Sequence, residues 1–76
     1  MPREQRVEIL AEMVANVLQV PVEVGDTVAV GDIVVLLESM KMEIPVIVEV
    51  AGTVSAVKVA QGDVVQEGDP LVELTA

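Results

Sequence analysis

The sequence predicts an all-β domain, folded as one small barrel or sandwich with a pseudo-twofold axis. Three observations lead to this prediction. The chain has 76 residues, which allows a single domain. Val, Ile and Leu account for 29 of them, and 19 are Val, whose β-branched side chain favours strands. The chain also repeats itself once, and because neither half is large enough to hold its own core, the two halves are expected to share one.

The composition excludes several functional classes. There is no Cys and no His, so zinc and iron–sulfur sites, Cys–His or Ser–His dyads and redox disulfides cannot form. The 13 acidic and 4 basic residues give a formal net charge of −9, and no aromatic ring can stack on a base, which argues against nucleic acid as a partner. The same charge disfavours anionic membrane surfaces. No apolar run approaches the ~20 residues that a transmembrane helix needs.

Residues 1–6 are predicted to be an N-terminal extension, and residues 7–76 the domain itself. The N-terminus lacks the apolar stretch and small-residue cleavage site of a secretory signal, so a cytoplasmic location is the expectation. Between Glu4 and Gln19 apolar residues recur at helical spacing, and this segment taken alone would be an amphipathic helix. Because the repeat assigns its second half to a strand, we interpret residues 7–13 as a strand as well.

The repeat is defined by a shift of 37 positions, which lays residues 14–38 over residues 51–75 without a gap and makes ten positions coincide. Two Gly-Asp pairs recur in each half, at Gly25-Asp26 and Gly31-Asp32 and again at Gly62-Asp63 and Gly68-Asp69. We interpret each unit as two short strands joined by a double turn, in which glycine adopts positive φ and aspartate bonds nearby backbone amides. Val28 and Val65 are expected to enter the core, and Gly52 is expected at a further turn.

Proline and acidic residues are placed consistently with this interpretation. Pro21, Pro45 and Pro70 fall at expected strand ends, edges or turns, as proline must in a sheet. The Gly-Asp pairs lack the denser acidic spacing of a calcium loop, so no metal site is predicted.

The segment between the repeats is predicted to be a hairpin with Met40 and Lys41 as its two central residues, so that Glu38 faces Glu43. Such residues are unusual there, because two-residue hairpins favour Asn-Gly and similar pairs that tolerate positive φ. Opposed glutamates repel, and methionine at a tip exposes apolar surface. Lys41 is also the only base in residues 7–57. We therefore interpret the tip as a surface that presents one lysine to a partner.

The stretch Glu38-Ser39-Met40-Lys41-Met42 resembles the E-A-M-K-M motif of the biotinyl domains of biotin-dependent carboxylases. Lys41 matches the lysine that takes biotin in that family, and it lies 35 residues before the C-terminus, as such lysines usually do. The stretch Ala51-Gly52-Thr53-Val54 is similar to an element that follows the hairpin in the family. The resemblance covers nearly the whole chain and implies a flattened β-barrel or barrel-sandwich hybrid of two four-stranded sheets. The chain looks like the small stand-alone biotinylated proteins and is expected to be complete.

The resemblance implies a biotin carboxyl carrier and not an enzyme. Biotin would be attached covalently to Lys41, with Met40 and Met42 beside the linkage. Glu38 and Glu43 would help a biotin protein ligase to select this lysine. The chain would then carry carboxybiotin between the active sites of a biotin carboxylase and a carboxyltransferase. No residue is predicted to be catalytic.

Other classes stay open on the sequence. A lipoyl carrier domain of a 2-oxo acid dehydrogenase complex has the same duplicated fold, but its lysine is typically flanked as D-K-A, unlike Met40 and Met42. An unmodified structural barrel, as in membrane-fusion proteins, usually carries a long inserted hairpin, which this chain lacks. An enzyme has no support, because neither acid–base partners nor a glycine-rich phosphate loop accompany Lys41.

Overall fold

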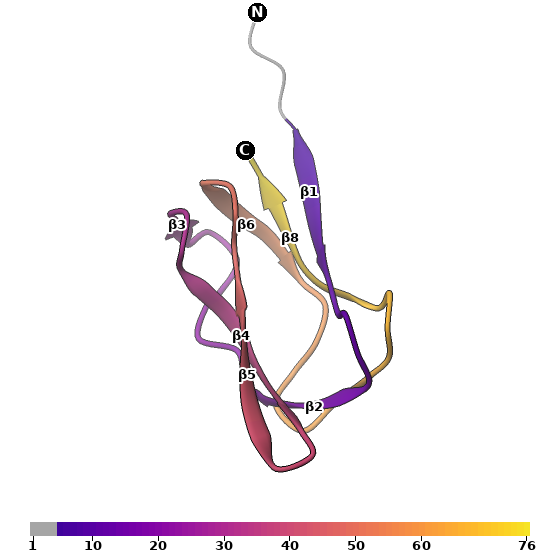
Figure 1. Ribbon diagram of the computed structural model, residues 1–76. Helices are drawn as coiled ribbons and strands as arrows, with labels where there is room; N and C mark the ends of the chain where they lie inside the picture. Colours follow the sequence, from indigo (N-terminus) through magenta and orange to yellow (C-terminus); the bar gives the residue numbers. More distant parts are fainter. Residues whose placement is uncertain (1–4) are drawn as a thin grey trace, which may run out of the picture.

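The computed structural model describes residues 5–76, which form eight β-strands in two four-stranded antiparallel sheets (Figure 1). The strands are β1 (Arg6–Leu10), β2 (Ala15–Gln19), β3 (Thr27–Val28), β4 (Ile33–Ser39), β5 (Met42–Ile47), β6 (Gly52–Val57), β7 (Val64–Val65) and β8 (Pro70–Thr75). One sheet has the order β1-β8-β6-β3 and the other the order β5-β4-β2-β7. The prediction of an all-β sandwich of two four-stranded sheets is confirmed. The described part of the chain contains no helix that could span a membrane.

The N-terminal segment is a strand, but it ends earlier than predicted. β1 pairs with β8 and stops at Leu10, whereas the predicted strand ran to residue 13. Ala11 donates its backbone N–H to the carbonyl oxygen of Asp69 at 2.8 Å and buries its side chain, and the chain then bends through residues 12–14. The helical spacing of apolar residues is therefore produced by two short strands and a bend. Of the predicted extension, residues 1–4 lie outside the described residues.

The two halves of the chain are related by a pseudo-twofold axis. Each strand of the first sheet has its equivalent in the second sheet: β1 corresponds to β5, β8 to β4, β6 to β2 and β3 to β7. The equivalent strands follow one another in the same order in the two sheets. The pairing registers follow the same rule, since Val7 faces Leu74 in one sheet and Ile44 faces Leu37 in the other. The duplication therefore extends to β1 and β5, although their aligned residues are nowhere identical.

The core is shared between the halves, as expected. Twelve of its buried residues form equivalent pairs 37 positions apart: Ala11 and Val48, Val17 and Val54, Val28 and Val65, Val34 and Leu71, Val35 and Val72, and Leu37 and Leu74. The remaining one, Ala15, corresponds to Gly52. Both halves thus lose solvent-exposed apolar surface against each other, which is the main favourable term in folding.

Four glycine turns join the two halves. Gly25, Gly31, Gly62 and Gly68 have φ between 90° and 98°, a region that glycine enters at little cost. The aspartate after each glycine accepts a hydrogen bond through Oδ2, at 2.9 Å, from the backbone N–H three residues before it. Each glycine N–H in turn donates to a carbonyl oxygen of the other half, as Gly25 does to Val54 at 2.8 Å.

Gly52 differs from these four and from the expectation of a turn. It is the first residue of β6 and has no positive φ. A Cβ atom at this position would lie 2.8 Å from the backbone oxygen of Thr75, which is closer than real Cβ contacts. Gly52 is therefore required by the close approach of β6 to the end of β8.

The three internal prolines lie where a sheet tolerates them. Pro70 is the first residue of β8, Pro45 lies in the edge strand β5, and Pro21 follows the end of β2. No interior strand therefore loses a ladder hydrogen bond in its middle to a proline.

Candidate functional site

The β4–β5 hairpin ends in a two-residue turn formed by Met40 and Lys41, and Glu38 faces Glu43 as predicted. Met40 has a φ of 53° and Lys41 a φ of 65°, and they are the only non-glycine residues with positive φ in the described part of the chain. Left-handed backbone costs a residue with a side chain about 1–2 kcal/mol. The fold uses glycine at its other positive-φ turns, so the absence of glycine at this tip indicates that function, not stability, determines its residues.

The side chains of the tip are exposed. Met40 is 87% exposed and Met42 is 58% exposed, and Lys41 between them is exposed as well. Glu43 is exposed and Glu38 is half-buried. The Lys41 amine is therefore open to approach by a large substrate, with soft apolar surface on both sides of it.

The tip is held firmly although it is exposed. Figure 1 shows it at the end of the molecule opposite the C-terminus and the start of β1. β4 lies between β5 and β2 in its sheet, and it buries Val34, Val35 and Leu37 in the core. The hairpin is thus anchored at its base and projects the lysine away from the rest of the chain.

The chemistry that the tip offers is that of one primary amine. Within residues 5–76, no group of three or more possible metal ligands occurs. A deprotonated amine is a nucleophile toward an activated carboxyl group, and the product is an amide. The exposed Lys41 therefore fits a prosthetic group that is attached through a carboxyl group.

A duplicated eight-stranded sandwich that presents one lysine on a strained hairpin defines a class of protein, the domain that carries a covalently attached prosthetic group. The biotin/lipoyl family model, described as "Biotin-requiring enzyme", matches residues 7–74. The chain belongs to this family.

Two relatives show how far the similarity extends. The chain is 63% identical over 40 residues to the "Biotinylated protein TB7.3" of Mycobacterium tuberculosis, and the match covers 53% of this chain and 56% of the relative. It is 47% identical over 64 residues to the "Biotin/lipoyl attachment protein" of Bacillus subtilis, with 84% of this chain and 88% of the relative covered. The match thus spans about half the length of the mycobacterial relative and most of the Bacillus one.

Two solved structures with the same fold are those of carboxylases. A single-chain, multi-domain long-chain acyl-CoA carboxylase matches with a TM-score of 0.87 and 31% identity, over 92% of this chain and 7% of that chain. The Kluyveromyces lactis urea carboxylase matches with a TM-score of 0.86 and 28% identity, over 97% of this chain and 6% of that chain. In both cases this chain corresponds to one small part of a much longer protein.

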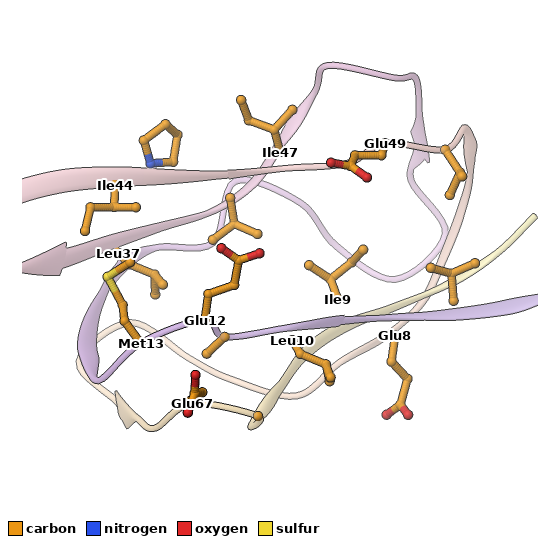
Figure 2. A pocket seen from close by; sticks show the side chains of 16 residues that line it. Glu8, Ile9, Leu10, Glu12, Met13, Leu37, Ile44, Ile47, Glu49 and Glu67 are labelled. Atoms are coloured by element: carbon orange, nitrogen blue, oxygen red, sulfur yellow. The ribbon is translucent and has the colours of Figure 1, made fainter.

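One surface feature was not predicted, a groove of about 860 Å³ between the edge strands β1 and β5 (Figure 2). The residues that line it form no recognisable sequence motif. The sequence feature that could have indicated the groove is the repeat: when the shift of 37 positions is continued toward the N-terminus, Leu10 aligns with Ile47 and Glu12 with Glu49. All four residues line the groove.

Proposed function

We propose that this chain is a biotin carboxyl carrier in which biotin is bound covalently to Lys41, and that it serves a biotin-dependent carboxylase. The observation that carries the proposal is the position of Lys41, exposed at the strained tip of a hairpin that the core anchors. Membership of the biotin/lipoyl family and the similarity to biotinylated proteins and carboxylase structures support it.

The attachment step uses the amine as a nucleophile. Lys41 Nζ loses a proton and attacks the carbonyl carbon of biotin that a biotin protein ligase has activated as an acyl adenylate. The new C–N bond forms, the C–O bond to phosphate breaks, and AMP leaves. Because a neutral amide replaces a charged amine, the formal net charge changes by −1, from −9 to −10. The chain supplies an accessible amine, and the ligase supplies the activated acyl group.

The residues around Lys41 provide surface for the ligase. Met40 and Met42 offer apolar contact beside the amine, and they are the side chains that the ligase and the attached group meet first. Glu38 and Glu43 form the second residue pair behind the turn and add two negative charges that the ligase can recognise. We assign these four residues to recognition and none of them to catalysis.

The role of the loaded carrier is positional. When bound, biotin supplies a ureido nitrogen that accepts and releases a carboxyl group. The anchored hairpin keeps the attachment point at one end of a rigid sandwich, where a biotin carboxylase and a carboxyltransferase can each reach it. Tethering in this way replaces free diffusion by a high effective concentration of the group at both active sites. The chain itself performs no chemical step in the transfer.

A lipoyl carrier is the second candidate, since the name of the Bacillus relative includes both groups. The two methionines beside Lys41 favour biotin. Incubating the purified unmodified chain with ATP and either biotin plus biotin protein ligase or lipoate plus lipoate ligase, and measuring intact mass, distinguishes the candidates.

The expected result is a mass increase of one biotin less one water, together with streptavidin binding. Lys41→Arg is expected to abolish both and to leave the circular dichroism spectrum unchanged. Lys58→Arg is the matched control, because Lys58 is the only other lysine and is also exposed, and it is expected to be modified fully. Biotin on the Lys41→Arg variant, or modification by lipoate alone, would contradict the proposal.

A further inference from the structure

The groove between β1 and β5 lies on the pseudo-twofold axis. Each of these strands has a single partner in its sheet, β8 for β1 and β4 for β5. Equivalent residues line the groove from both sides, namely Ile9 and Val46, Leu10 and Ile47, and Glu12 and Glu49. Figure 2 shows Ile9 and Glu12 projecting from the N-terminal segment toward the space below β5. The duplication therefore leaves one open seam, where the two copies of the first strand face each other without pairing.

The chemistry of the groove is apolar and acidic. Leu10 is 46% exposed and Ile47 is 49% exposed, but both side chains point away from the space between the strands, whereas Ile9 and Ile44 point into it (Figure 2). Four carboxylates line the groove, those of Glu8, Glu12, Glu49 and Glu67, and none of the described lining residues is a base. A ligand that fills this groove favourably must be apolar where it meets Ile9 and Ile44 and positively charged where it meets the carboxylates.

β1 has backbone groups to offer such a ligand. Gln5 and Ala76 exchange two N–H···O bonds, of 3.3 and 2.8 Å. In an antiparallel ladder, pairs that exchange bonds alternate with pairs that do not. The register of β1 with β8 therefore points the backbone N–H and C=O of Arg6 and Glu8 away from β8. This side of β1 is an unpaired edge of the kind to which an extended segment adds.

β5 is closed to the same kind of pairing. Pro45 occupies the position equivalent to Glu8 and faces away from β4 in the same alternation. Proline has no N–H, so it cannot donate to an added strand. Of the two edges that border the groove, β1 is therefore the one that can accept a strand.

We propose that the groove binds an extended segment of a partner protein in which apolar residues alternate with lysine or arginine. The segment pairs with the backbone of Glu8, packs its apolar side chains on Ile9 and Ile44, and directs its cations toward Glu12 and Glu49. A second copy of this chain is disfavoured, because each copy has a net charge of −9 and the groove that it would enter is lined by four carboxylates. Lys41 does not line the groove, so the proposal is independent of the attached group.

The test is an NMR titration of the ¹⁵N-labelled chain with a short synthetic peptide of alternating valine and lysine, blocked at both ends. Chemical-shift changes are expected in residues 6–13 and 44–50, and the Glu8 amide is expected to exchange more slowly with solvent when the peptide is bound. Added salt should weaken binding, since cation–carboxylate attraction is screened. The same peptide with glutamate in place of lysine should cause no shifts.

Two variants separate the charges from the backbone edge. The double variant Glu12→Gln with Glu49→Gln should weaken binding about fivefold, the loss expected for two solvent-accessible ion pairs. Its matched control, Glu23→Gln with Glu43→Gln, removes the same charge outside the groove and should change binding less than about twofold. Glu8→Pro copies the natural Pro45 into β1 and should abolish the slowed exchange and most of the binding.

Four results would overturn the proposal. Shifts spread over the whole acidic surface would show non-specific attraction, as would equal weakening by the two double variants. Binding of the acidic peptide as tightly as the basic one would remove the charge argument. Sedimentation of the peptide-free chain as a dimer that Glu8→Pro dissociates would show that the groove holds a second copy. Since biotinylation of Lys41 is measured separately, failure here leaves the proposed carrier function intact.

Discussion

Replacing Met40 by glycine is expected to stabilise the unmodified protein, although it removes a large side chain. Met40 has a φ of 53°, and this conformation costs a residue with a Cβ atom about 1–2 kcal/mol. Its side chain is 87% exposed, so little burial is lost. Glycine adds about 0.5–1 kcal/mol of entropy cost on folding. The difference leaves a net gain of roughly 0.5–1 kcal/mol. In a domain of this size that corresponds to a rise in Tm of about 3–6 °C.

Urea denaturation followed by far-UV circular dichroism measures this difference, with a thermal scan as a second readout. Ala29→Gly is the matched control, because Ala29 is an exposed loop residue without positive φ. Glycine at that position should lower the free energy of unfolding by about 0.5–1 kcal/mol. The expected order of stability is Met40→Gly, then wild type, then Ala29→Gly. If Met40→Gly is as unstable as Ala29→Gly, the tip is not strained and its sequence needs no functional explanation.

Three further predictions concern stability and are measured by the same urea titration. Gly52→Ala should destabilise the fold by about 1–3 kcal/mol, since the new Cβ would meet the backbone oxygen of Thr75 at 2.8 Å, and an unchanged midpoint would refute the close approach. Leu37→Ala and Leu74→Ala should each lower the free energy of unfolding by about 2–5 kcal/mol. Because the two leucines occupy equivalent core positions, the two losses should agree within about 1 kcal/mol, and a larger difference would contradict the shared core. Glu43→Gln should stabilise the hairpin by about 0.2–1 kcal/mol by relieving repulsion from the opposed glutamate, and destabilisation would show that the pair is not repulsive.

Much of the fold follows from local sequence signals. The Gly-Asp turns are recognisable because only glycine enters positive φ cheaply and aspartate caps the turn it follows. The hairpin is recognisable because placing Met40 and Lys41 at its centre keeps the apolar positions of both strands on one face. Lys41 stands out as a candidate site because an isolated base without a glycine at a tight turn has no structural reason to be there.

Other features depend on tertiary distances that local signals do not contain. The helical spacing near the N-terminus arises because β1 ends at Leu10 and the chain bends toward β2, which is decided by pairing with β8. Gly52 is needed because the backbone of Thr75 comes close, and no turn signal accompanies it. The open edge of β1 could not be found by aligning the two halves of the sequence, because β1 and β5 are equivalent in space but share no identical residue. What makes β1 the open edge is a difference between the halves: Glu8 has a backbone N–H, and Pro45 at the equivalent position has none.

The central claim is that Lys41 carries biotin, and the most direct test is tandem mass spectrometry of the chain isolated from the cell in which it is naturally made. Proteolysis that releases the β4–β5 tip separates Lys41 from Lys58, so the modified lysine can be assigned from fragment ions. The account predicts biotin in amide linkage on Lys41 and an unmodified Lys58. Lipoate on Lys41, biotin on Lys58, or two unmodified lysines in cells whose other biotin proteins are fully loaded would contradict it.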